Sequence, residues 1–262
     1  MPASYTHYMF GQAVYNKLSK ELKDVIDKNK PVYNIGLSGP DIFFYYKPLS
    51  KNHVNSIGHD MHREDATHFF KEAKERINKY ELEEGIPYIL GFICHFILDS
   101  NCHPYIAKAM EENGLSHCEI EAELDGRVMR SNNESPQKIS AGKHIVASKE
   151  CSKVISQFYD GIDSGEIYKA LKSVRFYNEI LLCQNNLKRN VVKGILENIK
   201  GAKSFSDMII NVVPNPKAKK IIDELIRLYE ISIYEAVQII EEYYYGLNNK
   251  SSINERFNRN FG

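Results

Sequence analysis

The chain has 262 residues, 43% of them hydrophobic and 26% charged, and its formal net charge is zero. This composition excludes a disordered chain, and the length allows one large domain, which we expect over residues 1–262. No run of Lys and Arg is long enough to bind duplex nucleic acid, and no apolar stretch is long enough to span a bilayer. Residues 1–7 lack the basic and apolar segments of a signal peptide, so we expect a cytoplasmic protein without a transmembrane segment.

The first predicted helix has Ser4 as its N-cap and ends at Lys30-Pro31. Its apolar pattern places His7 on the inward face, where a single histidine is more often a core side chain than a ligand. The next stretch combines turn residues with a run of aromatic residues, which indicates a loop packed against the core. Asp41 lies in this loop after a Gly-Pro pair, where the commonest role of an Asp is to cap a turn.

Residues 51–80 are polar, helix-prone and contain four histidines. His59 and His62 are three apart and can share a helix face, so either one is a candidate for a site. His53 and His68 are typical of surface residues.

A helix that begins near Pro87 is apolar on nearly all sides and is therefore predicted to be central. His95 and Asp99 are four residues apart and share one face of it. A buried carboxylate is costly unless it is paired or binds a metal, so this pair indicates a functional site. Pro104 is expected to begin a new helix, which leaves His103 at an unwound junction whose ring turns back toward Asp99.

A capping box of Ser116 and Glu119 begins the following helix. His117, Glu121 and Asp125 then lie on one face, with the same spacing as the ligand candidates of the preceding helix. Carboxylates at this spacing are also typical of a solvated helix face, and for Asp125 both interpretations stay open.

Further helices are predicted over residues 143–160, 164–182, 185–200 and 216–245, the last ending at Gly246. Only His144 lies beyond residue 131, so residues 143–262 are expected to be helical scaffold. No segment has the alternation of a strand, and the fold class is predicted to be all-α.

The candidate ligands in the two central helices are His95, Asp99, His103, His117 and Glu121. These imidazoles and carboxylates suit zinc better than magnesium or calcium and exceed the needs of one tetrahedral site, which predicts more than one ion. Two ions bridged by a carboxylate are the usual arrangement for hydrolysing phosphodiesters. The five cysteines form no Cys-x-x-Cys pair and are expected to be mostly buried apolar residues.

In order and type, a larger series of residues resembles the ligands of the bacterial zinc-dependent phospholipase C family. The series is Thr6-His7, Gly39-Pro40-Asp41, His62 (with His59 as the alternative), His95 and Asp99, His103-Pro104, and His117 and Glu121. The resemblance implies an all-α multi-helix bundle with a multinuclear zinc cleft. By position, Asp41, His62, His95 and Asp99 would hold one Zn²⁺, His103, His117 and Glu121 a second, and Asp99 would bridge to a third that His7 also binds.

The chain departs from the secreted members of that family in two respects. Their third zinc is also held by an amino-terminal tryptophan, and this chain has no tryptophan. The spacing from Asp99 to His103 is also shorter than in the secreted bacterial enzyme. These departures make the number of ions, two or three, the open question about the cofactor.

The function that the resemblance implies is that of a metal-dependent phosphodiester hydrolase. A zinc-activated water would attack the phosphorus of a phospholipid or of a related small-molecule phosphodiester, with Asp41 as both ligand and candidate general base. One alternative within the same superfamily is a single-strand nuclease, in which the aromatic residues 43–46 stack on bases. The other alternative is a non-catalytic helical protein that the metal stabilises.

Overall fold

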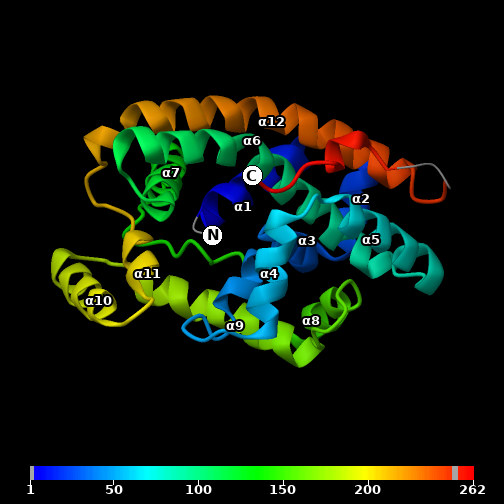
Figure 1. The fold of residues 1–262 in the computed structure, drawn as a ribbon. Coiled ribbons are helices and arrows are strands. Elements are labelled where there is room, and N and C mark those ends of the chain that lie inside the picture. The colour runs from blue at the N-terminus through cyan, green and yellow to red at the C-terminus, as the bar shows by residue number, and fades with distance from the viewer. Residues whose placement is uncertain (1–2, 250–252) are drawn as a thin grey trace.

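The computed structural model describes residues 3–249 and 253–262, and these residues form helices and loops without a strand (Figure 1). The prediction of an all-α fold is confirmed. Residues 1 and 2, part of the amino-terminal stretch considered above, lie outside the described residues. The helices, including the short 3₁₀ helices η1 to η4, are α1 (Ser4–Lys17), α2 (Lys20–Lys28), α3 (Lys30–Gly36), η1 (Gly39–Tyr45), α4 (His53–Arg63), α5 (Thr67–Tyr80), η2 (Glu83–Gly85), α6 (Ile86–Asn113), α7 (His117–Ser131), α8 (Lys149–Ser156), α9 (Ser164–Leu181), α10 (Asn186–Asn198), α11 (Lys203–Asp207), η3 (Pro216–Ala218), α12 (Lys219–Tyr245) and η4 (Glu255–Phe257).

Helix α6 is the centre of the fold, as its apolar sequence predicts. Every residue from 87 to 100 is buried. Helix α12 packs along one side of α6, and α3 and α1 pack on other sides of it (Figure 1). Each large apolar side chain buried in this way contributes about 1.5–3 kcal/mol of stability. The polar side chains of α6 are therefore held in the most rigid part of the molecule.

Helices α3 and α6 approach so closely that two glycines are required between them. A Cβ atom on Gly36 would lie 2.2 Å from the carbonyl oxygen of Tyr88, and one on Gly91 would lie 2.3 Å from that of Tyr33. Because real Cβ atoms do not approach a backbone oxygen so closely, any side chain at either position would push the helices apart. This contact fixes the distance between α6 and the segment that leads into η1.

The first helix is shorter than predicted, and the expectation of one helix ending at Lys30-Pro31 is wrong. Helix α1 ends at Lys17, and the Ser19 side chain caps α2 by accepting from the Leu22 amide at 3.3 Å. Pro31 lies in the first turn of α3, where a proline has no hydrogen bond to lose. The N-cap of α1 is Ala3, which offers no side-chain cap, and not Ser4.

The predicted break at Pro104 is also wrong. Helix α6 continues through Pro104 to Asn113, and the left-handed Gly114 ends it. Proline removes one backbone hydrogen bond, but burial of the surrounding turns against α12 and the rest of the core keeps the helix continuous. His103 therefore stays on the same face as Asp99 without any unwinding.

The C-terminal half supplies helices that support the centre. Helices α9, α10 and α12 fall within their predicted ranges, whereas only α8 forms within residues 143–160, and α11 was not predicted. Helix α9 packs against η1, and α12 packs against α1, α6 and α7. Among the described residues, no helix combines the length and apolar character needed to cross a membrane.

The α3–α6 contact can be tested with a Gly→Ala substitution made once in the contact and once, as a control, outside it. Gly91→Ala should lower the free energy of unfolding by about 1–3 kcal/mol, because the new methyl group meets backbone. Gly194→Ala in α10 is the matched control, since nothing lies within 4 Å of its Cβ position. The control should raise the free energy of unfolding by about 0.5–1 kcal/mol, because Ala favours a helix over Gly. Urea denaturation followed by circular dichroism measures both, and equal effects would contradict the packing argument.

Candidate metal centre

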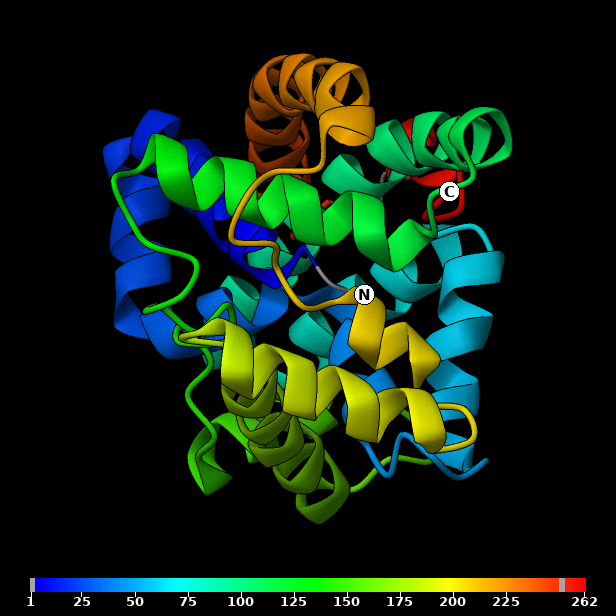
Figure 2. The same ribbon diagram turned by 90° about the vertical axis from the view of Figure 1, so that its left-hand side faces the viewer.

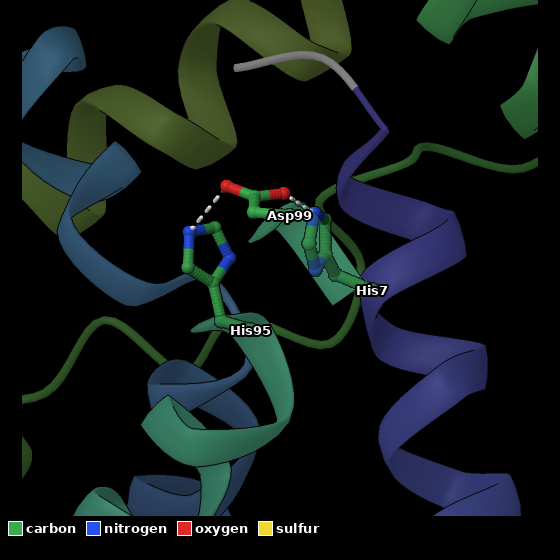
Figure 3. A group of neighbouring side chains, drawn as sticks. All are labelled: His7, His95 and Asp99. Carbon is green, nitrogen blue, oxygen red and sulfur yellow. Dashed lines mark ion pairs between the residues drawn. The ribbon is translucent and has the colours of Figure 1, made fainter. Parts of the chain in front are cut away.

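The carboxylate of Asp99 lies between two imidazoles that come from different helices (Figure 3). His95, one turn earlier on α6, places its Nε2 3.1 Å from Asp99 Oδ2. His7 of α1 places its Nε2 3.0 Å from Asp99 Oδ1. Each oxygen of the carboxylate thus faces a different ring, and His7, His95 and Asp99 form one group whose ligand atoms all lie within 4.8 Å of one another.

A second group adds side chains from η1 and α4. Asp41 Oδ1 lies 3.0 Å from His62 Nε2, and the same nitrogen is 4.0 Å from Asp99 Oδ2. The other ring nitrogen of His62 is 2.8 Å from the carbonyl oxygen of Gly58, so a proton on Nδ1 donates to that carbonyl and leaves Nε2 directed at the carboxylates. Asp41, His62 and His95 together form a second group with ligand atoms within 4.8 Å.

Gly39 allows η1 to lie against α6 at this point. Its φ of +49° is in the left-handed region, which favours glycine. A Cβ atom at this position would also lie 2.1 Å from the ring of His95. The Gly-Pro-Asp sequence therefore has a structural reason: glycine permits the close approach, and Asp41 follows inside the first turn of η1.

A third group forms where α6 meets α7. His117 Nε2 lies 3.0 Å from Glu121 Oε2, and His103 Nε2 lies 3.6 Å from Glu121 Oε1. His103 Nε2 is also 3.6 Å from Asp99 Oδ1, which connects this group to the first. The predicted capping box of Ser116 and Glu119 is present and fixes the start of α7, one residue before His117.

All the residues predicted as ligands thus come together in the structure, in three adjoining groups. His62, and not its alternative His59, faces the centre, because His59 is exposed and its ring packs on Phe44. His53 and His68 are exposed, as expected of surface residues. No cysteine belongs to these groups among the described residues.

The buried donor atoms fit a metal ion better than they fit one another. His95 is fully buried, and neither of its ring nitrogens has a hydrogen-bond partner; the same is true of Asp99 Oδ2 and His103 Nε2. These atoms lie 3 to 4 Å from the opposite ligands without the angles of hydrogen bonds. Leaving such groups unsatisfied costs about 1–3 kcal/mol each, and a cation placed between them removes that cost. Imidazole and carboxylate donors are those that zinc takes in proteins.

The carboxylates and imidazoles of the cluster shift one another's pKa values. Burial opposes the ionisation of Asp99, but the charge of His103 and of two further imidazoles holds the pKa of this carboxyl well below its usual range. The imidazoles beside Glu121 and Asp41 also contribute to lowering the pKa of each carboxyl against the effect of burial. Burial lowers the pKa of His103, yet the carboxylates of Asp99 and Glu121 raise it to about 9. A metal ion would replace these protons on the rings.

Asp125 has a structural role that its spacing did not reveal. It is buried and not part of a solvated helix face; the same holds for Glu121. Its Oδ1 accepts from the Thr6 amide at 2.8 Å and from the Thr6 hydroxyl at 2.7 Å, and its Oδ2 accepts from the Tyr5 amide at 3.3 Å. Asp125 therefore caps α1, whose own N-cap has no side-chain cap, and fixes the turn that carries His7.

Two further residues at the centre were not found from the sequence. Phe261 is buried with its ring 5.2 Å from that of His62 and 5.9 Å from that of His95, so the chain near residue 261 packs against these two rings. His144 is buried beside α1 with its ring stacked 4.6 Å from that of Tyr8, and burial lowers its pKa to about 3. Neither residue has a periodic or spacing signal, because only tertiary packing brings them here.

An all-helical protein that gathers imidazoles and carboxylates from four helices and η1 in its core has an architecture compatible with metal binding. The family model described as zinc dependent phospholipase C matches residues 6–170, which include every candidate ligand. The chain belongs to this zinc-dependent phospholipase C family. No curated protein and no solved structure matches the chain at a significant level.

Because Asp125 caps α1, its substitution should destabilise the protein although Asp125 is not a candidate ligand. Asp125→Ala should lower the free energy of unfolding by about 1–3 kcal/mol, because it leaves the Thr6 and Tyr5 amides buried without an acceptor. Asp60→Ala in α4 is the matched control, since Asp60 is exposed and pairs only with Arg63 on the surface. It should change stability by less than about 0.5 kcal/mol. Thermal and chemical denaturation measure both, and equal stability of the two variants would refute the assigned cap.

Proposed function

We propose that this chain is a zinc-dependent phosphodiesterase that cleaves the phosphodiester bond of a phospholipid headgroup. The observation that carries the proposal is the shared Asp99 carboxylate, which presents one oxygen to His95 and His62 and the other to His7 and His103. A carboxylate between two sets of imidazoles is the arrangement that holds two ions close together. The family to which the chain belongs supports the same chemistry.

The proposed ligand assignment follows the three groups. Asp41, His62, His95 and Asp99 hold one Zn²⁺, His103, His117 and Glu121 hold a second, and His7 with Asp99 contributes to a third. When bound, such ions lower the pKa of a water molecule and neutralise the charge of the phosphate. The side chains His62 and His117 are 18% and 36% exposed, whereas the other candidate ligands are buried, so substrate reaches the cluster from the side of these two rings.

Asp41 is the proposed general base. Its carboxylate lies in the first turn of η1 beside His62, one of the two partly exposed rings of the cluster. The low pKa of Asp41 keeps it ionised but makes it a weak base, so this role rests on its position beside His62, from which the carboxylate can accept a hydrogen bond from the attacking water and orient it. His62, held by its contact with the Gly58 carbonyl, positions the Asp41 oxygen.

The nuclease alternative has less support from the geometry. Single-strand nucleases need exposed aromatic rings for the bases, but the residues proposed for this role are all buried in η1 and at its end: Phe43, Phe44, Tyr45 and Tyr46. The cytoplasmic location and the absence of a duplex nucleic-acid partner stay predictions from the sequence.

Activity and metal content together test the proposal. Protein purified without chelator should contain two or three zinc ions per chain and hydrolyse p-nitrophenylphosphorylcholine. His95→Ala should lower this activity more than about 100-fold and reduce the zinc content, because His95 is fully buried between two of the groups. His68→Ala removes an exposed imidazole of α5 and should change neither quantity.

Four results would count against the proposal. A protein free of metal, or a His95→Ala variant with full activity, would contradict the hydrolytic site. Faster turnover of single-stranded DNA than of phospholipid would favour the nuclease. Retained zinc with no turnover of any phosphodiester, combined with loss of the fold on chelation, would favour a metal that only stabilises the protein.

A further inference from the structure

The surface formed by α10 and the loop around Leu49 carries several large apolar side chains that are exposed. Helix α10 has no buried residue. Its large apolar residues Leu187, Val191, Ile195 and Ile199, the last at its C-cap, are 76%, 52%, 56% and 40% exposed. They are spaced four residues apart and therefore follow one side of the helix. A contiguous stripe of this kind marks a contact surface.

A groove beside this stripe is lined only by apolar and aromatic residues. It has a volume of about 230 Å³ and lies between α9 and α10, with Ile180, Val192 and Leu196 among its walls. Leu49, which is 54% exposed, lies at the same groove. Figure 2 faces this side of the molecule, and α10 lies at the front of it across α9. We define the stripe on α10, the groove and Leu49 as the α10 face.

The charges around the α10 face are unequal, although the chain as a whole is neutral. From residue 186 to residue 204 the only acidic residue is Glu197, and the basic ones are Lys188, Arg189, Lys193, Lys200 and Lys203. Lys188 and Arg189 bond to neighbouring parts of the chain, but Lys200 and Lys203 are exposed, as are Lys47 and Lys51 on either side of Leu49. Apolar residues bordered by lysines are the pattern of a helix that lies in the interface of an anionic membrane.

We infer that the α10 face docks the protein on the surface of a membrane that contains anionic lipids. The choice of a lipid surface over a protein partner rests on the proposed function, because a phospholipid substrate lies in such a surface. Leu187, Val191 and Ile195 insert among the lipid chains, while the surrounding lysines contact the phosphates. Docking thereby transfers these exposed apolar side chains from water to the lipid, which is favourable.

The α10 face extends toward the part of the metal centre that contains His62. A second hollow of about 560 Å³ shares Leu49 and Phe205 with the groove and is bounded further on by Phe44. The ring of Phe44 packs 5.0 Å from that of His62, one of the two partly exposed candidate ligands. Docking through α10 therefore brings the headgroup layer to the edge of the centre at which substrate enters.

Vesicle co-sedimentation tests the docking surface without requiring catalysis. The protein should bind vesicles of phosphatidylcholine with about a third of phosphatidylglycerol, and bind pure phosphatidylcholine at least tenfold more weakly. The double variant Val191→Ser, Ile195→Ser should bind the anionic vesicles at least tenfold more weakly than the unchanged protein. The matched control Val213→Ser, Ile231→Ser changes residues that are 75% and 52% exposed outside the α10 face and should bind within twofold of the unchanged protein.

A charge-reversed pair tests the lysines in the same assay. Lys200→Glu, Lys203→Glu should weaken binding at least tenfold, whereas Lys219→Glu, Lys220→Glu at the start of α12 should have less than a threefold effect. All four variants alter exposed residues, and unchanged melting temperatures confirm that they fold. Hydrolysis of p-nitrophenylphosphorylcholine should stay within twofold in every variant, while hydrolysis of vesicle lipid should fall in parallel with binding.

The outcomes separate this inference from the proposed function. Vesicle binding that depends on α10, without hydrolysis of any substrate, supports the docking surface and refutes the function. Hydrolysis with no binding to anionic vesicles, or with binding that the α10 variants leave unchanged, overturns the docking surface alone. The protein could instead dimerise in a concentration-dependent way without binding vesicles, and the variant Val191→Ser, Ile195→Ser could abolish that dimerisation. This result would show that a second copy of the chain covers the α10 face, and it would overturn the inference of membrane docking.

Discussion

Asp99 lies in the middle of α6, in a stretch where every residue from 87 to 100 is buried and most are apolar, and the imidazoles around it keep the pKa of its carboxyl low. A charge in such surroundings is tolerated only when cations or strong donors lie around it. The structure supplies four imidazoles within 4.0 Å, from α1, α4 and two further turns of α6. Two of those imidazoles, His62 and His103, in turn face Asp41 and Glu121, so the requirement of one buried charge organises the whole cluster.

The surrounding helices hold that cluster in place through close backbone packing and a helix cap. Gly36 and Gly91 set the distance between α3 and α6, and Gly39 lets η1 rest against the ring of His95. Asp125 caps the start of α1 and thereby fixes the turn that carries His7. None of these residues is a candidate ligand, yet each determines where a candidate ligand lies. The geometry of the centre therefore depends on the packing of the entire bundle and not on the ligand helices alone.

The sequence is most informative where the physical signal is local. Spacing of four residues identified His95 with Asp99 and His117 with Glu121, and the capping box of α7 was predictable because it needs only Ser116 and Glu119. His7 and Asp41 have no such spacing, and only the resemblance to a known family joined them to the others. The break predicted at Pro104 failed because burial of α6 outweighs the loss of one hydrogen bond. The role of Asp125, the position of Phe261 and the exposure of α10 depend on contacts between distant segments, which no local pattern reveals.

Anomalous diffraction at the zinc absorption edge, from crystals grown without chelator, tests the central claim most directly. The account predicts two or three zinc peaks, with the carboxylate of Asp99 in contact with two of them through its two oxygens. It also predicts one peak within reach of His103, His117 and Glu121. The account would be contradicted by a structure in which no zinc contacts Asp99 and both oxygens of the Asp99 carboxylate accept hydrogen bonds only from histidine N–H groups.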